Sequence, residues 1–220
     1  MNTSVSKNSK AFAPALSYKY KNALYLNITS RCPTACEFCI KFSWDYQYRG
    51  YNLLLKNEPS VREILDACPE PGKYSEIVFC GYGESTYRLK EMIQIARSLK
   101  ENGAKKIRLN TIGLGNLIQG RNIVPDLARV LDSVSVSLNT ADPDQWVRTL
   151  HPLPEFKARG FESVLAFIRE SAGRVPETYV SAVDTIVQDP AAFQTFVESL
   201  GAKVKIRPYL DEYEDESSRA

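Results

Sequence analysis

Residues 27–39 read NITSRCPTACEFC and place Cys32, Cys36 and Cys39 in the spacing C-x3-C-x2-C. They follow a short apolar run, Ala23–Ile28, which we predict to be a strand. A loop that directly follows a strand of a parallel sheet lies at the edge where active sites form. Three thiolates on one short loop therefore predict a metal centre at that edge rather than a disulfide framework.

The number of cysteines in this loop bears on which metal centre it holds. A [4Fe–4S] cluster usually takes four cysteine ligands, so three leave one iron open to a further ligand. The amino and carboxylate groups of a methionine moiety can chelate such an iron. Structural zinc is the alternative, but zinc prefers a closed tetrahedral site of Cys and His ligands. The only histidine is His151, so Cys68, Cys80 or a carboxylate would have to complete a zinc site. The spacing favours an iron–sulfur cluster.

Size and composition are those of a globular chain. It has 220 residues, 44% hydrophobic and 25% charged, with a net charge of +2, which suits one domain. Because this net charge is close to zero, we do not expect a nucleic-acid partner. The N-terminus lacks the apolar segment of a secretory signal, and no apolar run approaches the roughly 20 residues that span a bilayer. We expect a cytoplasmic protein with reduced cysteines and no membrane association.

Short β-type runs alternate with helical patterns along the chain. The predicted strands are residues 23–28, 77–80, 106–111, 134–138, 179–187 and 204–207, and the predicted helices cover residues 61–65, 89–99, 124–131, 161–168 and 193–200. Such repeated strand–helix units predict an α/β fold with a parallel sheet, either an open doubly wound sheet or a partial (βα)6 barrel. We expect a flexible N-terminal tail over residues 1–22, one core domain over 23–210 and an acidic C-terminal tail over 211–220.

The cysteine segment resembles the cluster loop of the radical S-adenosylmethionine (radical SAM) superfamily, including the aromatic Phe38 before the third cysteine. The resemblance extends from about Leu24 to Tyr209. In more detail the chain is similar to the TatD-associated radical SAM proteins, through NITSRCPTACEFC, GYNLLLKNEPS, FCGYGEST, RLNTIGLGN and SVSLNTADPDQW. The resemblance implies the partial (βα)6 barrel, a [4Fe–4S] cluster on Cys32, Cys36 and Cys39, SAM as cofactor, and Phe38 near its adenine.

A glycine-rich segment follows the second predicted strand, where residues 80–85 read CGYGES. Glycines let the backbone approach a ligand closely, and the carboxylate of Glu84 can accept charge-assisted hydrogen bonds from an ammonium group. The segment resembles the superfamily's Gly-Gly-Glu-Pro motif, which binds the methionine amino group, although Tyr82 is interposed and Ser85 replaces the proline. We therefore take Gly81, Gly83 and Glu84 as candidate SAM-binding residues.

Polar residues mark two further strand ends. Asn110 ends the third predicted strand, and alternation puts Ser135, Ser137 and Asn139 on one face of the fourth. A polar face is unusual on a parallel strand, and a barrel lumen that holds a ribose and a carboxylate would explain it. By the resemblance Asn110, Ser137 and Asn139 are cofactor-binding candidates; the alternative is that these side chains only bond to neighbouring backbone.

Two other features admit more than one interpretation. Arg207 ends the sixth predicted strand and either meets a substrate anion or lies on the surface. The aromatic stretch with Trp44, Tyr46, Tyr48 and Tyr51 either covers the cluster and binds substrate or is a packed surface loop.

The resemblance implies an enzyme that reduces SAM with its cluster and forms a 5′-deoxyadenosyl radical, which abstracts a hydrogen atom from a substrate. An external electron donor such as a flavodoxin or ferredoxin is then required. A short chain with no second cysteine cluster favours a small-molecule substrate over a protein or peptide. A non-catalytic, zinc-stabilised binding module is the alternative from another class.

Overall fold

The computed structural model describes residues 13–209. Seven strands form one sheet in the order β1-β2-β5-β6-β7-β8-β9. β1 is antiparallel to β2, and each later neighbour is parallel to the one before it. The strands are β1 (Ser17–Tyr20), β2 (Ala23–Leu26), β5 (Glu76–Phe79), β6 (Ile107–Thr111), β7 (Ser133–Ser137), β8 (Glu177–Val183) and β9 (Lys203–Arg207). The six parallel strands follow one another in chain order, which confirms the predicted α/β fold.

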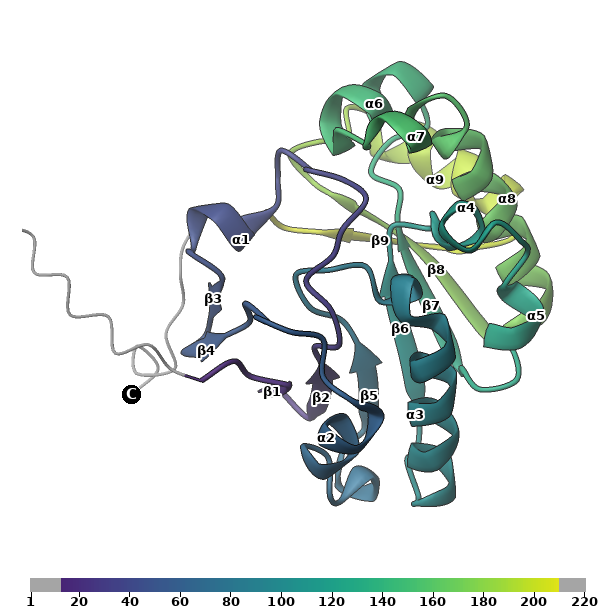
Figure 1. The fold of residues 1–220 in the computed structure, drawn as a ribbon. Coiled ribbons are helices and arrows are strands. Elements are labelled where there is room, and N and C mark those ends of the chain that lie inside the picture. Colours follow the sequence, from purple (N-terminus) through teal and green to yellow (C-terminus); the bar gives the residue numbers. More distant parts are fainter. Residues whose placement is uncertain (1–12, 210–220) are drawn as a thin grey trace, which may run out of the picture.

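Helices connect the parallel strands and cover the outer face of the sheet (Figure 1). They are α2 (Val61–Asp66), the 3-10 turns η1 (Pro71–Lys73) and η2 (Ser85–Arg88), α3 (Leu89–Glu101), α4 (Gly115–Gln119), α5 (Val124–Leu127), α6 (Pro143–Leu150), α7 (Pro154–Lys157), α8 (Gly160–Arg174) and α9 (Pro190–Ser199). Figure 1 shows β8 and β9 running across the direction of β2, β5 and β6, so the sheet curves strongly. Its inner face is turned towards a segment with α1 (Ile40–Ser43) and the hairpin β3 (Gln47–Tyr48) and β4 (Tyr51–Asn52).

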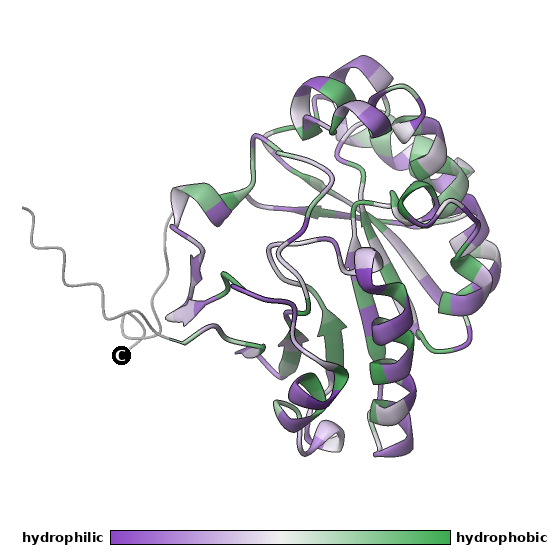
Figure 2. Cartoon of the chain, viewed as in Figure 1, coloured by the Kyte–Doolittle hydropathy of each residue, from purple (hydrophilic) through white to green (hydrophobic). Residues whose placement is uncertain are grey.

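The sequence explains why the helices pack on one face only. In β7, Val134 and Val136 are fully buried while Ser135 and Ser137 are half-buried on the other face. Met92 and Ile95 of α3 belong to the same fully buried core as these valines. Helices and strands accordingly carry separate hydrophobic and hydrophilic faces (Figure 2). Apolar burial between sheet and helices leaves the concave face free to carry polar groups.

The helix ends follow sequence rules. The Ser60 side chain accepts from the backbone N–H of Glu63, and the Glu63 side chain accepts from the backbone N–H of Ser60, which forms a capping box at the start of α2. Asp189 caps α9 by accepting from two backbone N–H groups. No helix in residues 13–209 is long and apolar enough to cross a membrane.

The structure corrects several details of the sequence-based prediction. Residues 17–20, expected within a flexible tail, form strand β1, and the Tyr18 side chain is only 5% exposed. The strand expected over residues 179–187 ends at Val183, and the third expected helix ends at Leu127 as α5. α4, α6 and α7 were not expected. The predicted acidic tail over 211–220, like residues 1–12, lies outside the described residues.

Candidate functional site

The three cysteines of the loop after β2 meet at one cavity. Cys32, Cys36 and Cys39 are free thiols, half-buried, and all three line a cavity of about 410 Å³ on the concave face of the sheet. The backbone N–H groups of Ala35 and Glu37 donate to the carbonyls of residues 151 and 149 at the end of α6. These bonds tie the loop to the far side of the barrel, so its position depends on the tertiary fold.

Thr34 lies between two of the thiols. Its hydroxyl is 3.4 Å from Cys32 Sγ and 3.2 Å from Cys36 Sγ. Burial raises the pKa of Cys36 to about 12 and also raises the pKa of Cys32, while the Thr34 hydroxyl acts against both shifts. Both are therefore neutral thiols at pH 7 until a metal displaces their protons.

The arrangement of the thiols fits a cluster. Within residues 13–209, no three His, Cys, Asp or Glu side chains are grouped to hold a single metal ion. An iron–sulfur cube takes one thiolate at each ligated iron, and three thiols that border one cavity from the same loop suit that requirement. Phe38 also lines the cavity, with the Arg207 guanidinium 5.9 Å from its ring centroid.

The glycine-rich segment packs directly against the cysteine loop. A Cβ on Gly83 would lie 2.3 Å from the carbonyl oxygen of Thr29 and 2.7 Å from that of Arg31. A Cβ on Gly81 would lie 2.3 Å from Oδ1 of Asn27. Only glycine permits this approach, so both glycines set the distance between the segment and the loop. Gly81 and Gly83 also line the cavity, as their predicted role requires.

Glu84 receives hydrogen bonds from several donors of the protein itself. The residue is 3% exposed, and its carboxylate accepts from the backbone N–H groups of Thr86 and Ile112 and from the hydroxyls of Thr86 and Thr111, at 2.8–3.1 Å. Burial raises the pKa of Glu84, and these hydrogen bonds act against the shift. Glu84 lines the cavity, so its contact with the cofactor stays a prediction, and its oxygens also join η2 to the end of β6.

The polar strand ends divide between the cavity and the structure behind it. Ser135, Ser137 and Asn110 line the cavity, and Asn110 Oδ1 accepts from Arg108 at 2.5 Å. Asn139, predicted to contact the cofactor, is fully buried and is not part of the lining. Its Oδ1 accepts from the backbone N–H of Val183 and its Nδ2 donates to Ser137 Oγ at 3.1 Å. Asn139 therefore orients Ser137.

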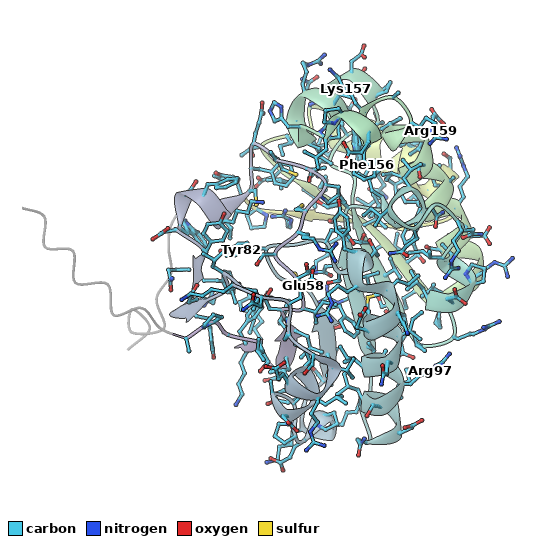
Figure 3. All side chains as sticks on the ribbon, in the orientation of Figure 1. Glu58, Tyr82, Arg97, Phe156, Lys157 and Arg159 are labelled. Carbon is cyan, nitrogen blue, oxygen red and sulfur yellow. The ribbon has the colours of Figure 1, made fainter. Side chains whose placement is uncertain are left out.

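Several lining residues were missed by the sequence reasoning. Tyr18, Tyr20 and Tyr25 come from β1 and β2, and Arg108 and Lys205 come from β6 and β9. Alternation of Tyr18 and Tyr20 around Lys19 is a strand signal that could have revealed the first two. The aromatic segment after the cysteines also reaches the cavity through Tyr48, and the Tyr82 hydroxyl donates to the Gln47 carbonyl at 2.7 Å. Figure 3 shows Tyr82 and Glu58 in the middle of the molecule, between the α1–β4 segment and α3.

A curved parallel sheet with a three-cysteine loop and a glycine-rich edge at the carboxyl ends of its strands defines a cofactor-dependent barrel enzyme. The chain matches the radical SAM superfamily over residues 26–188 and belongs to it. It is a radical SAM enzyme, and the family implies a [4Fe–4S] cluster and SAM as cofactors. Membership also decides against the alternative of a non-catalytic zinc-stabilised module.

Individual relatives agree with this assignment. The chain is 30% identical over 166 residues to the tungsten-containing aldehyde ferredoxin oxidoreductase cofactor-modifying protein of Pyrococcus furiosus, covering 74% of this chain and 43% of that protein. Streptococcus suis SuiB bound to the precursor peptide SuiA superposes with a TM-score of 0.64 at 15% identity, covering 86% of this chain and 40% of SuiB. Methylornithine synthase PylB gives a TM-score of 0.60 at 12% identity, covering 86% and 53%. These similarities confirm the partial-barrel fold, and the chain spans only about half the length of these relatives or less.

Proposed function

We propose that this enzyme cleaves SAM reductively and uses the resulting 5′-deoxyadenosyl radical to abstract a hydrogen atom from a small molecule. The observation that carries the proposal is the convergence of three free thiols, the glycine edge at Gly81 and Gly83, and the polar face of β7 on one cavity. These groups supply, in one place, ligands for a cluster and hydrogen-bonding partners for a nucleoside and an amino acid.

Each group has a distinct task in this proposal. Cys32, Cys36 and Cys39 would hold the cluster, which when bound supplies the electron that breaks the carbon–sulfur bond of SAM, leaving methionine. The backbone at Gly81 and Gly83 would bind the methionine amino group. No side chain shields this backbone, because a Cβ has no room at either position. Phe38 would pack on the adenine, and Asn110 and Ser137 would bind polar groups of the cofactor. Glu84 and Asn139 hold these groups in place.

The substrate class rests on weaker similarity. The Pyrococcus relative is named for modifying a cofactor, which supports a small-molecule substrate here. SuiB was solved with a precursor peptide, but at 15% identity its likeness concerns the fold. Modification of a protein or peptide is therefore the second candidate.

Further features of the proposal follow from the chemistry and the sequence. Reduction of the cluster requires an external one-electron donor, for which we propose a flavodoxin or ferredoxin. Thiols that must stay reduced suit the cytoplasm. Within the superfamily we propose the TatD-associated subgroup, on the five sequence segments quoted above.

Anaerobic reconstitution with iron and sulfide tests the proposal. With dithionite and SAM, we expect the wild type to form 5′-deoxyadenosine, detected by mass spectrometry. Cys36→Ala should lose both the cluster and the product. Cys68→Ala is the matched control, because Cys68 is another free cysteine but lies outside the cavity lining. Stoichiometric zinc in place of iron and sulfide in the wild type, or equal product from Cys36→Ala, would contradict the proposal.

A further inference from the structure

One wall of the cavity is built from tyrosine rings. Tyr18 and Tyr20 of β1, Tyr25 of β2 and Tyr48 of β3 all line it. Tyr18 stacks on Tyr25 with ring centroids 5.1 Å apart, and Tyr48 meets Tyr18 edge-on at 5.5 Å. Tyr18 is only 5% exposed, so the preformed aromatic surface is presented mainly by the half-buried rings of Tyr20, Tyr25 and Tyr48. A planar, unsaturated group is the ligand that such a surface binds best.

Basic residues outnumber acidic residues in the lining of the cavity. Arg108, Lys205 and Arg207 line it, and the lining contains one acid, Glu84, whose carboxylate is taken up by Thr86, Thr111 and Ile112. Arg108 is itself paired with Glu76 at 2.7 Å. Apart from the cysteines that would hold the cluster, the side chains of the lining therefore carry a surplus of positive charge, which attracts an anionic ligand.

Lys205 and Arg207 are the two cations in this surplus. Within residues 13–209 neither side chain has an ion-pair partner, and the carboxylate of nearby Asp184 accepts instead from the backbone N–H groups of Thr185 and Tyr209. Arg207 lies over Phe38 on the side of the cysteines, where the cofactor belongs. Lys205 is exposed and lies opposite Ser181 in the register of β8 and β9, and Ser181 also lines the cavity. Lys205 is thus the cation left for a second ligand.

The two sets of residues come from opposite edges of the sheet. β1 and β9 are its first and last strands, and both contribute to the same cavity because the sheet curves. We propose that the substrate is an anionic small molecule with a planar ring, whose ring packs on the tyrosine wall and whose carboxylate or phosphate pairs with Lys205. This inference rests on the proposed function and names the substrate class for that site.

Three small probes separate the effect of charge from that of the ring. They are 4-hydroxybenzoate, its neutral analogue 4-hydroxybenzamide and the non-planar anion cyclohexanecarboxylate. We would measure their binding to the full-length, cluster-loaded protein with SAM by saturation-transfer NMR and calorimetry. We expect 4-hydroxybenzoate to bind about tenfold more tightly than either analogue, a difference of about 1.4 kcal/mol.

Two variants on β9 assign the charge effect. Lys205→Gln should weaken binding of 4-hydroxybenzoate to the level of the amide and leave the amide unchanged. Lys203→Gln is the matched control, because Lys203 is an exposed lysine of the same strand that lies over the Tyr179 ring and not in the cavity lining. Tyr20→Leu should remove the preference for the planar anion over cyclohexanecarboxylate.

Failure of the substrate assignment can be told apart from failure of the proposed SAM cleavage. Formation of 5′-deoxyadenosine by the wild type without any probe tests that function alone. Absent or equal binding of all three probes, or equal effects of Lys205→Gln and Lys203→Gln, would overturn the assignment of the substrate class even if SAM is cleaved.

Discussion

The Thr111 hydroxyl lies 2.9 Å from both carboxylate oxygens of Glu84, deep in the molecule between η2 and the end of β6. This contact joins the glycine segment to the next strand of the sheet. Because Thr86 and Ile112 also donate to the same carboxylate, every hydrogen-bonding group around Glu84 at this point is a donor. Glu84, which lines the cavity and is predicted to bind the cofactor, thus also fixes the segments that frame the cavity.

Glu84→Gln tests that structural role. The amide would bring its own N–H groups against donors, so at least one buried partner would lose its acceptor. We expect the free energy of unfolding of the apo protein to fall by about 1–3 kcal/mol, measured by urea denaturation. Glu101→Gln, at the exposed end of α3, should change it little. Equal stability of Glu84→Gln and wild type would refute the role.

Gly83→Ala tests the close approach of the glycine segment to the cysteine loop. The new Cβ would overlap two backbone carbonyls, which cannot rotate away as a side chain would. We expect a loss of stability of about 1–3 kcal/mol and a smaller yield of cluster on reconstitution, measured by iron content and absorbance. Gly173→Ala is the matched control in α8, because apart from the adjoining backbone of its own helix no atom lies within 4 Å of its Cβ position. Similar cluster yields for the two variants would contradict this prediction.

Glu58 gives a prediction about pH. It accepts from the Thr29 hydroxyl and from Arg31 Nε, both at 2.7 Å, and so ties the start of the cysteine loop to the segment before α2. Partial burial acts to raise the pKa of Glu58, but the hydrogen bonds from Thr29 and Arg31 outweigh it and lower the pKa below its ordinary value of 4.5. A lowered carboxylate pKa contributes stability above the ordinary pKa and loses it as the pH falls through the folded pKa.

The wild type should therefore lose more stability than Glu58→Gln when the pH falls from about 6 to about 3. Urea denaturation of both apo proteins at several pH values measures the difference. Glu101→Gln is measured alongside as a control for the loss of an exposed carboxylate elsewhere on the surface. The same pH dependence in Glu58→Gln and wild type would show that the contact has no energetic role.

The sequence predicted the features that depend on local spacing. The cysteine loop, the two close-packed glycines and the alternation of Val134 and Val136 with Ser135 and Ser137 are readable from the chain. The parallel order of the sheet follows from repeated strand–helix units. Each of these depends on neighbours a few residues apart, and each has a counterpart in the structure.

The sequence could not show the features that depend on distant contacts. The orientation of the Glu84 carboxylate is set by Thr111, the last residue of β6, and by Ile112, which follows it. β1 was hidden because Lys19 and Lys21 give it the polarity of a tail, although the turn at Lys21, where φ is 53°, joins it to β2 as a hairpin. The tyrosine wall forms only where the β1–β2 hairpin packs beside β3, a contact that the sequence does not show.

The last prediction concerns the pair Asn139 and Ser137. Asn139 Oδ1 accepts from the Val183 N–H, which fixes the orientation of the amide, so its Nδ2 must donate to Ser137 Oγ. The Ser137 hydroxyl then has its own hydrogen left to donate into the cavity.

Asn139→Gly suits the left-handed backbone there, with φ of 68°, but frees the Ser137 hydroxyl to rotate. For Ser137→Ala we expect SAM binding, measured by calorimetry, to weaken three- to tenfold, about 0.5–1.5 kcal/mol. For Asn139→Gly we expect a loss no larger than this. The double variant should bind SAM no more weakly than Ser137→Ala, because Asn139 acts only through that hydroxyl. If Asn139→Gly weakens binding as much in the Ser137→Ala background as in the wild type, the two residues act independently and the positioning role of Asn139 is wrong.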